Sequence, residues 1–158
     1  MADLAGTYPL PDSQLDRFLL RLALGYPDEA AERALLSGTE RRQLIARAMP
    51  LLGIADVLAL REAVLAVHAS DALVRYVQAL LSHSRRQPGV RVGLSPRAGI
   101  ALLRAARAHA LLLGRDHVLP EDVQALFAQV AAHRLVPEAD GGGDDALARS
   151  ILQAVPVD

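Results

Sequence analysis

Apolar residues recur along most of this chain at the three- and four-residue spacing of helices that bury one face. In residues 71–85, Ser70 is placed to cap such a helix. Its predicted buried stripe consists of Leu73, Val74, Val77, Leu80 and Leu81. The same pattern predicts further helices at 14–18, 28–37, 40–48, 54–67, 96–113, 120–134 and 146–155. We therefore predict an all-α protein, a helical bundle, in which 54–67 is amphipathic.

One apolar run is too short to show helical spacing. Residues 19–24 read Leu-Leu-Arg-Leu-Ala-Leu and are ended by Gly25-Tyr26-Pro27. We predict a strand here, after a short non-helical leader that contains two prolines. A strand needs a partner, and no second convincing strand is present, although 90–92 can form a brief extended piece. The isolated strand indicates that its sheet lies outside this chain.

The best-defined helix signals lie between Gly93 and Gly114. Ser95 can accept a hydrogen bond from a first-turn amide, and Pro96 suits the first helical position. Gly114 is suited to closing the helix. Arg97 falls in the first turn, beside unpaired N–H groups that favour an anion, so this cation does not serve helix stability. Arg97 is therefore either a solvated surface residue or part of an anion site.

Composition and charge narrow the possible functions. The formal net charge is −1, which predicts no general attraction to nucleic acid or to an anionic membrane. A helix-turn-helix DNA-binding function is disfavoured for this reason and because no basic recognition helix is present. No apolar run approaches the ~18 residues of a membrane span, and no signal peptide is visible at the N-terminus. We expect a cytoplasmic protein.

Self-contained catalytic motifs are missing from the sequence. All 17 positively charged residues are arginine, so the lysine of a Walker A motif is absent. Five scattered histidines form no HExxH motif and there is no cysteine, so we predict no metal site. The acid pairs Glu121-Asp122 and Asp144-Asp145 fall at predicted helix starts, where capping accounts for them.

Arg17 lies between the proline-containing leader and the predicted strand. A guanidinium held at such a junction can reach across a subunit boundary and stabilise the charge of a transferring phosphoryl group. Local pairing of Arg17 with Asp12 or Asp16 is the alternative.

A series of short motifs resembles the C-terminal part of the MoxR-type AAA+ ATPases. Their joint occurrence in one order, over residues 6–155, makes the resemblance specific. The motifs are Gly-Thr-Tyr-Pro-Leu-Pro at 6–11, Gln-Leu-Asp-Arg-Phe-Leu at 14–19, Gly-Tyr-Pro at 25–27, Val-His-Ala-Ser at 67–70, Tyr76, Gly-Leu-Ser-Pro-Arg-Ala at 93–98, Gly-Arg-Asp at 114–116, Val118, Pro-Glu-Asp-Val at 120–123 and His-Arg-Leu at 133–135.

The resemblance implies a domain organisation. Residues 1–27 would be the end of an AAA+ core, with the last core strand at Leu20 to Leu24. Residues 28–137 would be the helical lid, and 138–158 a flexible Gly-rich link and a C-terminal helix packed on the lid. The Walker A, Walker B and sensor 1 residues lie outside the chain. Leu119 departs from the family, which commonly has Thr or Ser as the cap before Pro120.

The resemblance also implies site residues and partners. Arg17 would be an arginine finger that contacts the ATP of a neighbouring subunit. Arg97, with Ser95 and Pro96 beside it, would be sensor 2 and contact the γ-phosphate of its own subunit's ATP. ATP and Mg²⁺ would be cofactors of the full-length protein, while none is expected on this chain alone.

The implied partners are the AAA+ core, further copies of the protein in a homo-oligomeric ring, a hexamer, and a von Willebrand factor A-type protein. The implied function is to couple ATP hydrolysis to chaperone-like remodelling of a client. A stand-alone helical adaptor for protein interactions, whose arginines face solvent, is the alternative.

Overall fold

The computed structural model describes residues 10–37, 45–138 and 144–157. Predictions that fall on other residues lie outside this description, including most of the leader, the first half of the 40–48 helix and most of the Gly-rich link. The chain divides into two compact units, Met1–Arg21 with Glu62–Asp158, and Leu22–Arg61. The domain boundaries predicted after residues 27 and 137 stay predictions.

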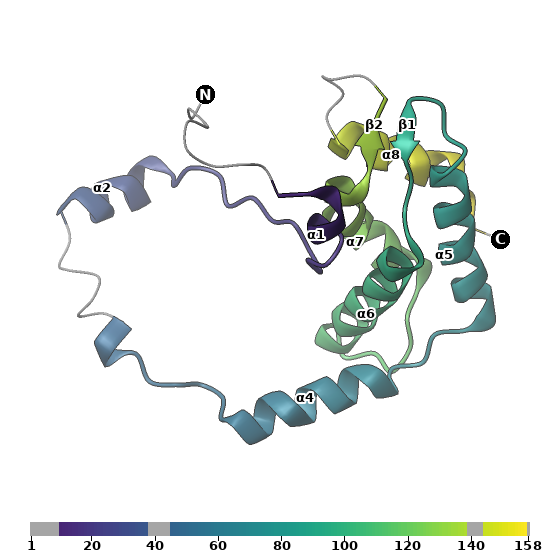
Figure 1. Ribbon diagram of the computed structural model, residues 1–158. Helices are drawn as coiled ribbons and strands as arrows, with labels where there is room; N and C mark the ends of the chain where they lie inside the picture. Colours follow the sequence, from purple (N-terminus) through teal and green to yellow (C-terminus); the bar gives the residue numbers. More distant parts are fainter. Residues whose placement is uncertain (1–9, 38–44, 139–143, 158) are drawn as a thin grey trace. The chain divides into compact units, whose positions relative to one another are not determined.

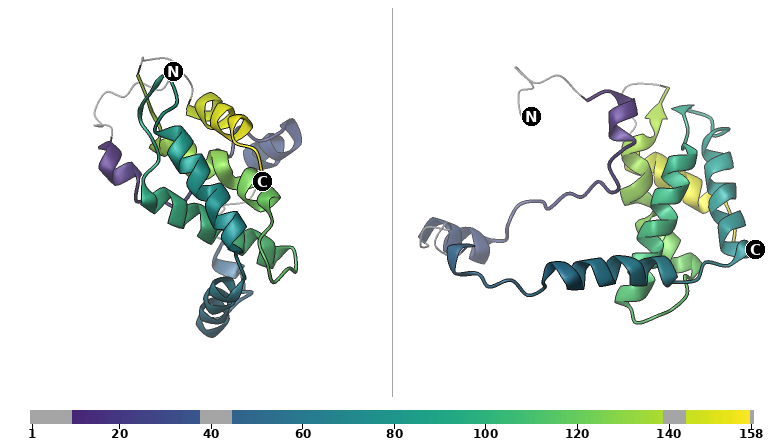
Figure 2. Two further views of the ribbon diagram at one scale, coloured as in Figure 1. Left: turned by 90° about the vertical axis from the view of Figure 1, so that its right-hand side faces the viewer. Right: turned by 60° about the horizontal axis from the view of Figure 1, so that its bottom comes forward.

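The first unit is a helical bundle (Figures 1 and 2). Its elements are α1 (Asp12–Leu15), the end of α4 (Ile54–Ala66), α5 (Asp71–Ser84), β1 (Val90–Val92), α6 (Pro96–Leu112), α7 (Pro120–Ala131), the 3₁₀ turn η1 (Ala132–Arg134), β2 (Val136–Pro137) and α8 (Asp144–Ala154). α6 packs against α5 and α7, α8 packs against α5 and α7, and α1 contacts η1. The predicted all-α lid-type bundle is confirmed.

Each main helix of the bundle contributes a large side chain to the centre of the core. Leu80, Leu102, Phe127 and Ile151 are all fully buried. Burying a side chain of this size contributes roughly 1.5–3 kcal/mol. The predicted stripe of α5 is buried except at Val74, which is 43% exposed. The spacing of apolar residues thus predicted four of the five buried positions of the α5 stripe correctly.

The helix that begins at Pro96 has the ends that its sequence predicts. The Ser95 hydroxyl accepts from the amide of Ala98 at 3.3 Å. At the other end Gly114 has a φ of +73°, its amide donates to the Leu111 carbonyl, and the amide of Arg115 donates to the Ala110 carbonyl, both at 2.9 Å. These two bonds form a Schellman motif, which requires the left-handed residue that glycine supplies.

The strand predicted at residues 19–24 is wrong in this structure. Residues 20–28 form neither helix nor strand. A strand is held by ladder hydrogen bonds to a neighbour, and in the described ranges the only sheet pairs β1 with β2. The extended piece predicted at 90–92 is confirmed as β1, antiparallel to β2. β2 has only two residues, too few to show an alternating pattern.

The second unit contains α2 (Glu29–Ser37) and most of α4. Asp28 caps α2, because its Oδ1 accepts from the amide of Ala31 at 2.7 Å. Neither helix has a buried residue. The helix predicted at residues 54–67 is present as α4, but the prediction that it is amphipathic is wrong. The charged residues of α4 point in different directions around the helix axis and leave no single apolar face.

Gly93 lies where the chain passes closest to the end of α5. A Cβ at this position would lie 2.7 Å from the Arg85 Cα and 2.8 Å from its backbone nitrogen. The next residue, Leu94, is held on both sides: its amide donates to the Ser84 Oγ at 2.9 Å, and its carbonyl accepts from the Arg85 Nε at 2.9 Å. This close approach sets the start of α6, where Arg97 lies.

We expect Gly93→Ala to lower the free energy of unfolding by about 2 kcal/mol, since the added methyl meets backbone and cannot be relieved by a rotamer change. Urea unfolding followed by circular dichroism measures the loss. Gly53→Ala is the control, because a Cβ there meets only the Asp56 carboxylate at 3.4 Å. An equal loss in both variants would contradict the steric explanation.

Candidate functional site

The carboxylate of Asp16 joins the start of the chain to the bundle. Asp16 follows α1, and its oxygens accept from the Ser95 hydroxyl at 3.0 and 3.2 Å. The same carboxylate accepts from the Arg134 Nε at 3.1 Å and lies 3.6 Å from the Arg97 Nη1. Ser95 and Arg97 belong to the start of α6, and Arg134 ends η1. One acidic side chain therefore connects three segments.

Arg134 is the buried partner of Asp16, with a side chain only 2% exposed. Its Nη2 donates to the carbonyls of Asp16 and Phe18, and its Nη1 donates to the carbonyls of Leu19 and Val130. Burial lowers the pKa of Arg134, while the hydrogen bond and charge of Asp16 act in the opposite direction. Because an arginine in a protein keeps its charge, these acceptors stabilise a buried cation.

A pocket of about 350 Å³ opens beside this network. It is lined by Asp16, Arg17, Leu19, Arg97, Ile100, Ala101, Arg104 and Arg134. Four arginines thus face one aspartate, which gives the pocket an excess of positive charge. Guanidinium groups form paired hydrogen bonds with phosphate and carboxylate oxygens, so a pocket of this kind can bind an anion.

The arginines of this pocket differ in how far they are already engaged. Arg97 is 58% exposed, and its side chain's one ion pair among the described residues is the long contact with Asp16. Arg17 and Arg104 are exposed, and within the part of the chain that the structure describes neither side chain has a hydrogen bond or ion pair. These three guanidinium groups are available to a ligand, whereas Arg134 is not.

The structure brings the predicted site residues Arg17, Ser95 and Arg97 into one region. Pro96 occupies the first position of α6 and does not line the pocket. The alternative partner Asp16 does not pair with Arg17, because its carboxylate is bonded to Ser95 and Arg134. The other alternative, Asp12, has a side chain outside the described set.

Three residues of the site were not predicted. Arg104 lies seven residues after Arg97, two turns along the same face of α6, and this spacing is a signal that the sequence does contain. Asp16 and Arg134 are 118 residues apart, and no local pattern in the sequence connects them.

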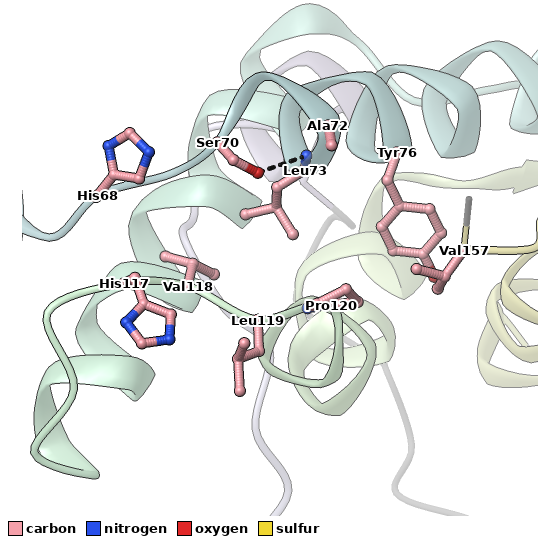
Figure 3. Close-up of a pocket in the computed structure, with 10 residues that line it drawn as sticks. All are labelled: His68, Ser70, Ala72, Leu73, Tyr76, His117, Val118, Leu119, Pro120 and Val157. Atoms are coloured by element: carbon pink, nitrogen blue, oxygen red, sulfur yellow. Dashed lines mark hydrogen bonds between the residues drawn. The ribbon is translucent and has the colours of Figure 1, made fainter.

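A second pocket, of about 360 Å³, lies between the starts of α5 and α7 (Figure 3). Its lining contains no Arg, Asp or Glu. The Ser70 hydroxyl already accepts from the Leu73 amide, the dashed line in Figure 3, and the His117 Nδ1 lies 2.8 Å from the Asp116 Oδ1. Its remaining wall is mostly apolar, so this pocket offers little chemistry for an anion or a reaction.

The acid with the most strongly shifted pKa, Asp122, lies at the start of α7. Two hydrogen bonds from Arg115, at 2.8 and 2.6 Å, hold the pKa of Asp122 far below its usual range. Asp122 also accepts from the Leu119 amide at 2.8 Å and lies 2.7 Å from the His109 Nδ1. Capping therefore accounts for only part of its role: Asp122 also ties the end of α6 to the start of α7. The bond to the Leu119 amide is the half of a capping box that the N3 side chain supplies, while Leu119 has no side-chain oxygen to supply the other half.

No cluster of three His, Asp or Glu side chains that could hold a metal ion occurs in residues 10–37, 45–138 and 144–157. Over the same ranges, no helix has the length and apolar content needed to cross a membrane.

Comparison with known proteins identifies the family. Residues 82–153 match the family model of the AAA lid domain. The sequence is 41% identical to the uncharacterized protein YeaC of Bacillus subtilis, over 96% of this chain and 49% of that protein. It is 34% identical to the chaperone MoxR1 of Mycobacterium tuberculosis, over 95% of this chain and 42% of that protein. This chain matches the C-terminal part of MoxR-type AAA+ proteins.

A solved structure extends the match to nearly the whole chain. The crystal structure of a provisionally assigned ATPase from Cytophaga hutchinsonii aligns with a TM-score of 0.83 and 28% identity. The alignment covers 99% of this chain and 52% of that one. This MoxR-type chain thus spans about half the length of the relatives that it matches.

The Asp122 cluster gives a pH-dependent prediction. We expect Asp122→Asn to lower the free energy of unfolding by about 3 kcal/mol at pH 7, because the variant loses a charged acceptor of Arg115. The pKa of Asp122 is depressed in the folded state, so its stabilisation is complete above the unfolded value of about 3.9 and is lost as the pH falls below it.

Urea unfolding of both proteins between pH 7 and pH 2 measures this difference. The difference in the free energy of unfolding between wild type and Asp122→Asn should begin to shrink as the pH falls below about 4. Glu121→Gln is the matched control, since the neighbouring acid is exposed, and it should change stability by no more than about 0.5 kcal/mol. A gap that is constant over the whole pH range would contradict the assignment.

Proposed function

We propose that this chain is the lid part of a MoxR-family AAA+ ATPase, and that its arginine-lined pocket binds a phosphate group of ATP held by the AAA+ core. The observation that carries the proposal is the pocket itself, in which Arg17, Arg97 and Arg104 are exposed around a single, already bonded carboxylate. An arrangement that only stabilised the fold would pair these cations with acids.

Arg97 is suited to the role of sensor 2. Its contact with Asp16 is long and its side chain is more than half exposed, so the contact contributes no more than about 1 kcal/mol and is easily exchanged for a phosphate. The amides at the start of α6 add positive partial charge beside it. In this proposal, hydrolysis removes the phosphate partner of Arg97 and releases the lid.

Arg17 is suited to the role of arginine finger. It lies between Asp16 and Phe18, which are both held by Arg134, and its own side chain faces the pocket. The family resemblance assigns Arg17 and Arg97 to the ATP of two different subunits. Because both line one pocket, we propose instead that they contact the same nucleotide, the one bound by the neighbouring subunit.

ATP and Mg²⁺ are the proposed cofactors of the full-length protein. Bound ATP supplies the phosphate to be transferred, and Mg²⁺ neutralises part of its charge. We assign no Mg²⁺ ligand to this pocket, because its one carboxylate is bonded to Ser95 and Arg134.

A finger supplied to a neighbour requires an assembly of subunits, so the proposal includes a homo-oligomeric ring, a hexamer. Its proposed work is chaperone-like remodelling of a client in the cytoplasm, with a von Willebrand factor A-type protein as partner. The second candidate, a stand-alone adaptor, is favoured by the exposed apolar side chains of residues 22–61, among them Leu24, Tyr26 and Leu51. In an adaptor the pocket arginines would be dispensable.

In a full-length MoxR-family protein that carries this sequence, we expect Arg17→Ala to lower ATPase turnover by about 10³-fold. Arg97→Ala should lower it by about 10²-fold, since one charged donor to the phosphate is lost. Steady-state ATP hydrolysis measures both effects, with thermal unfolding as the check on folding. Arg75→Ala, an exposed arginine on α5 away from the pocket, is the control. Unchanged turnover in both pocket variants would exclude the ATPase role and favour the adaptor.

A mixed assembly tests whether the two arginines share one nucleotide. Subunits with both Arg17→Ala and Arg97→Ala are mixed with subunits whose P-loop lysine, in the core, is replaced. Turnover should return on mixing, because an intact nucleotide site of the first subunit then meets both arginines of the second. Mixing subunits with Arg17→Ala alone is the control, in which turnover recovers under either assignment. Recovery in the control but not with the double variant would assign Arg97 to its own subunit.

A further inference from the structure

We infer that Arg134 is a positioning residue that fixes Arg17 to the lid bundle, so that Arg17 and Arg97 reach an anion as one preformed pair. The inference rests on the proposed function for the role of Arg17, but the attachment itself can be tested separately.

The hydrogen bonds of Arg134 are concentrated on the segment around Arg17. Its guanidinium donates to the Asp16 carboxylate and to the backbone carbonyls of Asp16, Phe18 and Leu19. These acceptors lie on both sides of Arg17 in the sequence. The remaining acceptor, the Val130 carbonyl, is one helical turn back in α7. The backbone of Arg17 is therefore held from both sides by one side chain.

The burial of Arg134 makes this attachment costly to break. A guanidinium removed from water is tolerated only where its donors are satisfied and its charge is paired. Here the segment 16–19 supplies most of the acceptors and, among the residues that the structure describes, the one charge paired with Arg134. If the segment left the bundle, Arg134 would be buried without partners or would have to rotate into solvent. The position of the segment and the burial of Arg134 consequently depend on each other.

Two further contacts attach the segment 16–19 and the residues directly after it to α7 and η1. The His133 Nε2 lies 3.1 Å from the Phe18 carbonyl. Because a carbonyl can only accept, Nε2 must carry the proton in this contact. The amide of Arg21 donates to the Gln129 carbonyl at 2.9 Å. Residues up to Arg21 accordingly belong to the same compact unit as the bundle, whereas the family resemblance places this segment on the core.

The attachment also fixes the relation between the two pocket arginines. Asp16, directly before Arg17, contacts both Arg134 and Arg97. A movement of the lid would carry Arg17 and Arg97 together. A site whose charged groups are already in place avoids the cost of ordering them when the ligand arrives.

Spin labelling tests the attachment directly, because the chain contains no cysteine and accepts single labels. A nitroxide at Phe18→Cys reports on the segment, since this side chain is half exposed and only the backbone carbonyl is bonded to Arg134. The reference label is at Val74→Cys, on an exposed position of α5 that does not line the pocket. We expect Arg134→Lys to narrow the spectrum of the first label and leave that of the second unchanged. Lysine keeps the charge, but its three donors sit on one nitrogen and cannot span the acceptors that the three guanidinium nitrogens reach.

Arg134→Gln is the second variant, in case a lysine at this buried position prevents folding. It removes the charge and should give the same narrowing at residue 18, with an unchanged spectrum at residue 74 as evidence of an intact bundle. An unchanged spectrum at residue 18 in a folded variant of either kind would overturn the inference.

A double-variant cycle of ATP hydrolysis connects the attachment to activity in the full-length protein. If Arg134 acts through Arg17, Arg134→Lys should lower turnover at least tenfold in the wild-type background and cause no further loss in Arg17→Ala. Equal losses in both backgrounds would show that Arg134 has a general structural role and would overturn the inference. If Arg17→Ala alone leaves turnover unchanged, the proposed role of Arg17 as an arginine finger fails, while the spectra still decide the attachment.

Discussion

The pairing of Asp16 with Arg134 is the interaction on which the arrangement of the site depends. Arg134 is almost completely buried, and removing the partner of a buried charge typically costs 3–5 kcal/mol. Asp16 supplies that charge from the other end of the chain, and with it comes the backbone that carries Arg17. The same carboxylate holds the Ser95 hydroxyl at the start of α6. This single ion pair thus sets the position of the segment that carries Arg17 relative to the end of η1.

Arginine serves two physical roles in this small region. Arg134 has every nitrogen bonded to protein acceptors and contributes to structure. Arg17, Arg97 and Arg104 keep most of their donors exposed and give the pocket its positive charge. Lysine could not perform the first role, because its ammonium group lacks the planar fork that reaches several acceptors at once. The role of each arginine follows from its burial and its partners.

The parts of the fold that the sequence predicted are those with local causes. Ser95 and Gly114 define the ends of α6 through bonds to residues three to five positions away. The position of Arg97 in the first turn of α6 also follows from its neighbours in the sequence, Ser95 and Pro96. The strand at residues 19–24 failed because a strand depends on neighbours, and apolar composition alone does not supply one. The hydrogen bonds from Arg134 to Asp16 and Phe18 could not be predicted either, since they join residues more than a hundred positions apart.

The two compact units differ in whether they bury a core of their own. The bundle does so through Leu80, Phe127 and their neighbours, whereas no residue of α2 or α4 is buried. In residues 22–61, helices are therefore supported mainly by local propensity and capping, which are worth about 1 kcal/mol per feature. All the residues that line the arginine pocket belong to the bundle unit. The geometry of the candidate site is consequently maintained by the unit that buries a hydrophobic core.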